Sequence, residues 1–176
     1  NPEIYSLVKN IAIGKTSIDL AKTTSGYEIF KVEDKKVKIN SFTNSEEKEV
    51  KASHLLICWK DISGCESGLT KEEVLTKINK LKSQATTANF KDLIKQNSTE
   101  PGARENAGEL GWFGAGKMVP AFESAAFSQT VGTIGGPVET EFGYHLIYKQ
   151  DERKVEEIKV SHILIRTKTE EDIIGP

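Results

Sequence analysis

Apolar and polar residues alternate along this chain in stretches that predict strands and helices in a definite order. The apolar and β-branched run Val50–Cys58 predicts a buried strand. Thr70–Glu73 has the spacing of a helix capping box, and apolar residues then recur at helical intervals, which predicts a helix over residues 70–83. Weaker patterns predict a short helix around Phe90–Ile94, a strand at 108–113, a helix beginning at Pro120, and strands at 137–140 and 143–149.

Part of the sequence occurs twice. Lys51–Ile57 recurs as Lys159–Ile165, and Ser25–Phe30 is similar to Phe142–Ile147, with Glu28 standing where His145 stands. A period of a little over a hundred residues indicates tandem domains and not a solenoid. We therefore expect a piece of a longer repeat protein. Its parts would be 1–47, the tail of a preceding repeat with a linker; 48–151, a complete domain; and 152–176, a linker and the first strand of a following repeat.

Charge and cysteine content exclude several classes of function. The 24 basic and 26 acidic residues leave a net charge of -2, so no nucleic-acid or membrane-surface partner is expected. Apolar stretches such as Leu55–Trp59 are too short to cross a membrane, and any signal peptide or anchor would have to lie outside this sequence. Cys58 and Cys65 fit no zinc or redox motif, so we expect no metal and no cofactor. With one cysteine in a strand and one in the following loop, we expect two free cysteines in preference to a disulfide across that loop.

Four strings in the middle of the chain resemble signatures of the parvulin family of peptidyl-prolyl cis/trans isomerases. They are Ser53–Leu56, Gly108–Phe113, Gly116–Phe122 and Phe142–His145, in the family's order and with family-like spacing over roughly a hundred residues. The resemblance implies an α+β fold with a four-stranded antiparallel sheet surrounded by helices, in the order βα3βαβ2. It also implies peptidyl-prolyl cis/trans isomerase activity.

The resemblance further implies how the domain acts on the peptide bond that precedes proline. The cis and trans forms of this bond are separated by a barrier of about 18–20 kcal/mol, and no covalent change is needed to cross it. A catalyst has to hold the proline ring in an apolar slot and favour the twisted amide. By resemblance, the slot is lined by Leu110, Met118, Phe122 and Phe142.

A catalytic polar cluster beside the slot is implied in the same way. His54 and His145 match the paired histidines of the family, which form a hydrogen-bonded cluster with a hydroxyl that matches Thr140. Glu100 stands where parvulins usually carry Cys or Asp facing the isomerising peptide, so it keeps the charge of Asp and adds a methylene. We expect the histidines to orient and tune the site and not to transfer protons.

Each of these assignments has a simpler alternative. Met118 and Phe122 would be ordinary core residues in a generic helix, and a histidine in a strand is more often structural than catalytic. The longer side chain of Glu100 would swing into solvent, as loop glutamates usually do, which would leave a weak or silent isomerase that serves as a peptide-binding chaperone module.

The substrate class and the partners follow from the resemblance and from one loop. The loop Trp59–Leu69 offers Lys60 against Asp61 and Glu66, so it lacks the basic cluster by which one subfamily binds phosphorylated Ser/Thr-Pro. We therefore expect unfolded, proline-containing client polypeptides, as for the extracytoplasmic foldases of the bacterial periplasm or cell envelope. The two terminal fragments are expected to pair, within one chain or by self-association.

Overall fold

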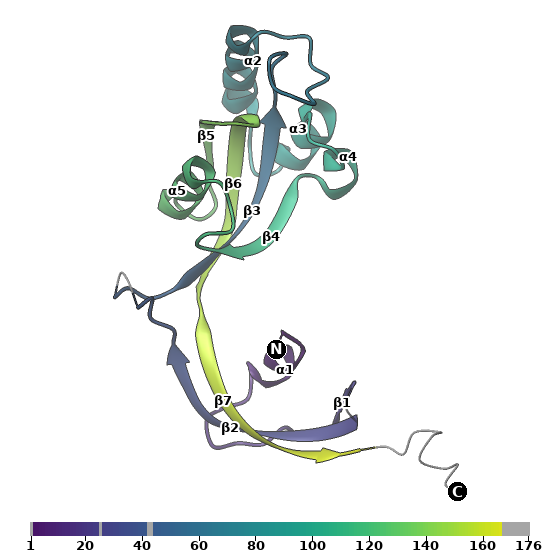
Figure 1. The fold of residues 1–176 in the computed structure, drawn as a ribbon, viewed down its shortest axis with the longest axis vertical. Helices are drawn as coiled ribbons and strands as arrows, with labels where there is room; N and C mark the ends of the chain where they lie inside the picture. Colours follow the sequence, from purple (N-terminus) through teal and green to yellow (C-terminus); the bar gives the residue numbers. More distant parts are fainter. Residues whose placement is uncertain (1, 25, 42–43, 167–176) are drawn as a thin grey trace, which may run out of the picture. The chain divides into compact units, whose positions relative to one another are not determined.

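The computed structural model describes residues 2–24, 26–41 and 44–166, which form two compact units. Unit 2 is residues 47–154, and unit 1 is the described part of 1–46 and 155–176. Figure 1 shows the elements of unit 2 in chain order: β3 (Lys48–Ile57), α2 (Lys71–Gln84), α3 (Phe90–Asn97), α4 (Ala103–Asn106), β4 (Glu109–Gly114), α5 (Pro120–Ser128), β5 (Ile134–Thr140) and β6 (Gly143–Lys154).

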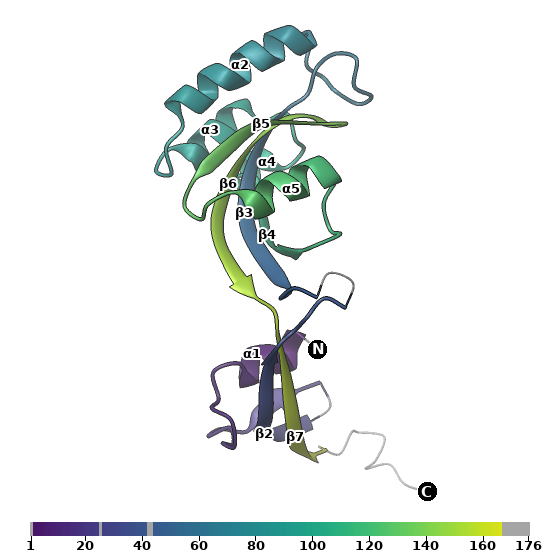
Figure 2. The ribbon, with the colours of Figure 1, turned by 90° about the vertical axis from the view of Figure 1, so that its left-hand side faces the viewer.

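The four strands of unit 2 form one antiparallel sheet in the order β4-β3-β6-β5. Helices α2 and α3 cover one face of this sheet and α5 covers the other (Figure 2). The α+β fold and the βα3βαβ2 order expected from the sequence are therefore confirmed. Strand β6 is longer than predicted, because it continues beyond residue 149 to pair Lys154 with Lys48.

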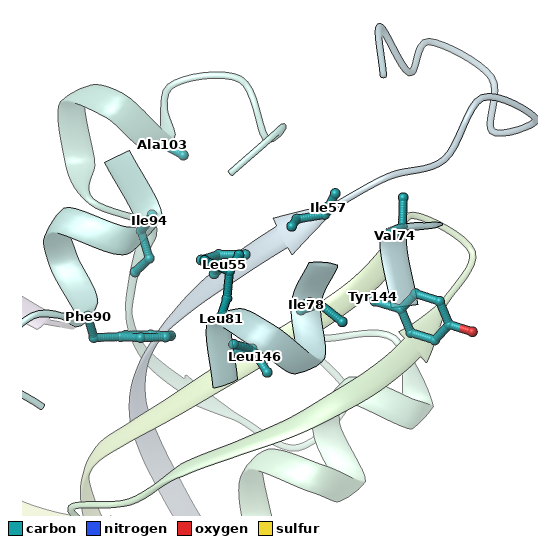
Figure 3. Packing of buried hydrophobic residues seen from close by; sticks show 10 residues of the cluster. All are labelled: Leu55, Ile57, Val74, Ile78, Leu81, Phe90, Ile94, Ala103, Tyr144 and Leu146. Carbon is teal, nitrogen blue, oxygen red and sulfur yellow. The ribbon is translucent and has the colours of Figure 1, made fainter. Parts of the chain in front are cut away.

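The larger core of unit 2 lies between the sheet and helices α2 and α3 (Figure 3). Leu55 and Ile57 point to this side because alternate residues of a strand face the same way. Helix α2 starts where its sequence predicted, since the Thr70 side chain accepts a hydrogen bond from the Glu73 N–H while Glu73 accepts one from the Thr70 N–H. The capping box therefore sets where α2 begins, and the helix buries Val74, Ile78 and Leu81.

The opposite face of the sheet carries a smaller core that ends in polar residues. Val50 and Ala52 of β3 pack with Phe122 of α5. Further along the same face of β3, the next position is His54, which is also buried. The site predicted from the sequence therefore lies where the apolar core under α5 gives way to histidines.

Cys58 and Cys65 form a disulfide, so the expectation that both are free was wrong. The intervening loop folds back in two turns, in which the Ile62 N–H donates to the Trp59 carbonyl and the Cys65 N–H to the Ile62 carbonyl. These turns bring the two cysteine Cα atoms to 5.9 Å, within the range that a disulfide spans.

Unit 1 joins the two ends of the chain. It contains α1 (Pro2–Val8), β1 (Ala21–Thr23), β2 (Gly26–Val37) and β7 (Glu156–Ile165), with the sheet order β1-β2-β7. Strands β2 and β7 are antiparallel, from Tyr27 opposite Ile165 to Val37 opposite Glu156. The expected contact between the terminal fragments is thus made within one chain, whereas residues 167–176 of the predicted last fragment lie outside the described residues.

Candidate active site

A pocket of about 390 Å³ opens in unit 2 beside α5 and the turn that joins β5 to β6. All four predicted slot residues line it, together with three of the four predicted polar residues. The fourth, Thr140, is hydrogen-bonded to His145. The full lining is His54, Leu56, Glu100, Pro101, Leu110, Lys117, Met118, Val119, Phe122, Phe142 and His145.

The apolar walls of this pocket come from three parts of unit 2. Leu110 lies on β4, Met118 precedes α5, and Phe142 lies in the turn before β6 with half of its surface exposed. Phe122, in the first turn of α5, is only 3% exposed and meets the rings of His54 and His145 edge-on, with centroids 5.5 and 5.3 Å away. Phe122 is therefore a wall of the pocket and a core residue at once.

The two histidines form the floor of the pocket. His54 of β3 and His145 of β6 lie on adjacent strands, with their rings stacked and their Nδ1 atoms 3.1 Å apart. His145 Nε2 lies 2.7 Å from Thr140 Oγ1, and His54 Nε2 lies 2.7 Å from Glu100 Oε2. Hydroxyl, imidazole, imidazole and carboxylate thus form one continuous polar chain.

The groups at the two ends of this polar chain determine which of its ring nitrogens carry hydrogen. An ionised Glu100 only accepts, so His54 Nε2 carries hydrogen, and with both rings neutral His54 Nδ1 then accepts from the Nδ1–H of His145. His145 Nε2 is left as an acceptor for the Thr140 hydroxyl, which itself accepts from the Phe142 N–H. The contact between His54 Nε2 and Glu100 is close in distance but is not aligned as a hydrogen bond, so Nε2 is the one buried atom of the polar chain without a hydrogen-bond partner.

Burial keeps His145 neutral. Desolvation is the main cause that lowers the pKa of His145 to about 3; repulsion by the charged form of His54 acts in the same direction, and the Glu100 carboxylate acts in the opposite direction. His145 is 3% exposed, so a charged imidazolium would have little water around it. At neutral pH the His145 ring is therefore uncharged.

Glu100 is held toward the pocket by the segment that precedes it. The Thr99 N–H and hydroxyl both bond the Leu56 carbonyl, and the Cys58 N–H donates to the Thr99 hydroxyl, which ties this loop to the end of β3. The contact with His54 lowers the pKa of Glu100, so the carboxylate is ionised at neutral pH. Its side chain is 31% exposed and lines the pocket, so it does not swing free into solvent.

Sequence reasoning did not select four of the lining residues, Leu56, Pro101, Lys117 and Val119. Leu56 had a usable signal, because it follows His54 by two positions in a strand and must share its face. Lys117 and Val119 lie within the string Gly116–Phe122, but their direction depends on how the chain turns into α5. Lys117 adds the only cation among the pocket residues that the structure describes.

Other parts of the described chain offer less chemistry. A larger hollow of about 600 Å³ lies in unit 1, and Lys15 and Asp19 are the charged residues in its otherwise neutral lining. No group of three or more His, Cys, Asp or Glu residues in the described ranges could hold a metal ion. No helix described here has the length and hydropathy that a membrane crossing requires.

Comparison with known proteins agrees with this fold. The family described as the PPIC-type PPIase domain matches residues 27–154, more than half of the chain, so the chain belongs to that family of peptidyl-prolyl isomerases. The foldase protein PrsA of Geobacillus sp. (strain WCH70) is 38% identical over 137 residues, which are 78% of this chain and 44% of the foldase. The chain therefore spans less than half of the length of this relative.

Two solved structures have the same fold as unit 2. The crystal structure of the PPIase domain of TbPar42 matches 58% of this chain and 99% of that chain, with a TM-score of 0.54 and 23% identity. The solution structure of TbPIN1 matches 58% of this chain and 97% of that chain, with a TM-score of 0.51 and 26% identity. Almost the whole length of each of these two structures is matched, so each corresponds to a single domain of this chain.

Proposed function

We propose that unit 2 catalyses cis/trans isomerisation of X-Pro bonds in unfolded client polypeptides. The observation that carries the proposal is an apolar slot that adjoins an ionised carboxylate: Leu110, Met118, Phe122 and Phe142 line the same pocket as Glu100. A proline ring carries no polar group for which the slot would have to provide a partner. With the ring in the slot, the X-Pro amide of the substrate would lie next to Glu100.

Glu100 acts on the twisted amide through its charge. Rotation about the C–N bond removes resonance, which leaves more negative charge on the nitrogen and more electrophilic character on the carbonyl carbon. A carboxylate near that carbon stabilises the twisted form more than either planar form, which is the condition for faster isomerisation. His54 holds the carboxylate at 2.7 Å from its Nε2, and His145 and Thr140 fix the orientation of His54.

The chemistry of the pocket favours unphosphorylated substrates. Lys117 is the single cation among its lining residues, whereas a phosphate dianion is usually held by two or more guanidinium or ammonium groups. The loop after β3 does not supply them, because Lys60 there is balanced by Asp61 and Glu66. Ordinary X-Pro segments of unfolded chains are the substrates that this site fits.

A protease-free assay on a series of X-Pro peptides tests the proposal. Glu100→Gln keeps the shape and removes the charge, so we expect slower isomerisation with an unchanged fold. Glu100→Asp restores the commoner residue, and a faster rate would mean that the length of the Glu side chain limits this enzyme. Equal rates for all three proteins would remove Glu100 from the mechanism.

A second candidate function is peptide binding without appreciable catalysis. It is favoured by the close contact between Glu100 and His54, because a carboxylate engaged by an imidazole is less available to the substrate. Binding of an unfolded client by a protein with no measurable isomerase rate would support this function. The same pocket residues would then serve as a docking site for proline.

We further propose that the chain is part of a multi-domain folding factor outside the cytoplasm. The Cys58–Cys65 disulfide supports this location, because such bonds persist in oxidising compartments. The similarity to a PrsA foldase supports the folding role. Secretion of a tagged full-length protein, followed by titration of its thiols, would test the location.

A further inference from the structure

The pocket of unit 2 contains one charged group that the proposed mechanism does not use. Lys117 lines this pocket together with the slot residues Met118 and Phe122, and its side chain is exposed. The carboxylate of the lining, Glu100, lies 2.7 Å from His54 Nε2. The pocket therefore combines an apolar slot with two opposite charges, of which only the carboxylate has a role so far.

The backbone on both sides of Lys117 is held in place. On one side, the Gly116 N–H donates to Glu123 Oε2 of α5 at 2.7 Å, and the φ of +78° at Gly116 is a left-handed conformation that glycine adopts readily. On the other side, Met118 and Val119 pack against the apolar core under α5. The point from which the Lys117 side chain starts is therefore fixed relative to the slot.

The Lys117 ammonium is free of partners within the part of the chain that the structure describes. No hydrogen bond or ion pair joins it to any of these residues. The carboxylate nearest to it in sequence, Glu123, accepts the Gly116 N–H, and the carboxylate of the same pocket, Glu100, lies against His54. A substrate in the pocket thus meets a cation that no described carboxylate has neutralised by direct contact.

We propose that Lys117 binds a carboxylate of the client directly after its proline, so that the site prefers prolines followed by Asp or Glu. This inference rests on the proposed use of the pocket as a proline site. Consecutive Cα atoms are about 3.8 Å apart, so the neighbours of a proline in the slot lie within reach of an extended lysine side chain that starts next to Met118. One ammonium matches the charge of one carboxylate, and a phosphate dianion usually requires more.

The position after the proline follows from the second charge of the pocket. In the proposed function, the X-Pro amide lies next to Glu100, and the residue before proline is attached to the carbonyl of that amide. An acidic side chain there would be repelled by the Glu100 carboxylate, whereas the residue after proline lies farther from the amide. The two charges of the pocket together favour an acidic residue on one side of the proline.

The expected preference is modest because the Lys117 side chain is exposed. Ion pairs between exposed groups change an equilibrium constant by about two- to fivefold. Salt weakens them, since the screening length falls from about 10 Å at 0.1 M to about 3 Å at 1 M ionic strength. The preference should therefore be largest at low ionic strength and disappear near 1 M salt.

Fluorescence anisotropy of labelled peptides with the full chain measures this preference. The peptides are identical except for Glu, Gln or Lys directly after the proline, and a second series varies the residue before it. At low salt we expect the dissociation constant of the Glu peptide to be about two- to fivefold below that of the Gln peptide, with the Lys peptide weakest. The series that varies the residue before proline should show no such gain for Glu.

Variants at position 117 assign the preference to this side chain. Lys117→Met keeps most of the apolar stem and removes the charge, so the Glu and Gln peptides should bind equally well. Lys117→Glu should reverse the order and favour the Lys peptide. Lys95→Met is the matched control, because Lys95 is an exposed lysine of α3 outside the pocket, and its removal changes the net charge equally. This control should keep the preference of the unmodified protein.

The outcomes separate this inference from the proposed function. Equal affinities for the Glu and Gln peptides, together with measurable isomerisation of both, would overturn the inference and leave the function standing. A preference that depends on Lys117 in a protein without isomerase activity would do the reverse. The inference is also overturned if Lys95→Met removes the preference as fully as Lys117→Met, or if a phosphoserine peptide binds tenfold tighter than the Glu peptide.

Discussion

The burial of His145 predicts that unit 2 loses stability in mildly acidic solution, well above the range in which carboxylates titrate. In the unfolded chain, a histidine titrates near its ordinary pKa of 6.5, whereas folding lowers the pKa of His145 to about 3. Below pH 6.5 the unfolded state therefore binds a proton that the folded state does not. Stability rises with pH in this window and falls as pH decreases.

The size of the effect follows from the two pKa values. Each pH unit below 6.5 costs about 1.4 kcal/mol as long as the pH stays above the folded value. Between pH 7 and pH 5 the loss is about 2 kcal/mol, a large share of the stability of an ordinary domain. Carboxylates such as Glu100, whose pKa is lowered by folding, add a loss of the same sign only at lower pH.

Urea unfolding followed by tryptophan fluorescence measures this loss in unit 2 alone, because Trp59 and Trp112 both lie in that unit. His145→Gln is the control, and its unfolding free energy should depend less on pH over the same range by about 2 kcal/mol. Both proteins retain His54, so the difference between their slopes belongs to His145 and its coupling to that neighbour. Parallel slopes for the two proteins would refute the reasoning, as would an NMR titration in which His145 becomes charged near pH 6.

Three further predictions concern the same unit. Phe122→Ala should lower the unfolding free energy by about 3 kcal/mol and also weaken peptide binding, because this ring belongs both to the core and to the pocket wall. Met118→Ala should weaken binding more than stability, because Met118 is only half-buried. Urea unfolding and peptide titration of both variants distinguish the two roles. Reduction of the Cys58–Cys65 disulfide should lower stability by about 2 kcal/mol, the loop-closure value for so short a loop, and identical melts with and without reductant would contradict it. A fragment of residues 47–154 should unfold in one cooperative transition and be more stable than one of 48–151, which lacks the last three residues of β6 that pair with β3; equal midpoints would show that these pairs contribute nothing.

Much of unit 2 could be predicted because its sequence signals are local. The capping box at Thr70 places the start of α2, and alternation in β3 divides Leu55 from His54 between the two faces of the sheet. The resemblance to the family then identified eight residues. Seven of them line one pocket in the structure, and the eighth, Thr140, is hydrogen-bonded to His145. The direction of the Glu100 side chain was left open by the sequence, because it depends on hydrogen bonds between the loop before it and the end of β3.

The features that were missed depend on distant or irregular contacts. The pairing of Cys58 with Cys65 required two successive turns in the loop between them, and the spacing of the cysteines alone does not reveal these turns. The extension of β6 to Lys154 depends on a partner strand about a hundred residues earlier, since the sequence there is charged and has no alternation of its own. Pairing with β3, and not the local strand propensity, therefore determines where β6 ends.

The pairing of Lys48 with Lys154 has a consequence for how this domain can be used. The chain enters and leaves unit 2 at neighbouring points of one antiparallel strand pair, just as Val37 and Glu156 lie opposite each other in unit 1. A domain whose two ends meet can be placed in a surface turn of a host protein without spreading the host's own strands. Unit 2 is therefore suited to domain insertion into an unrelated scaffold. It is equally suited to circular permutation, in which its ends are joined and new ends are opened away from the pocket.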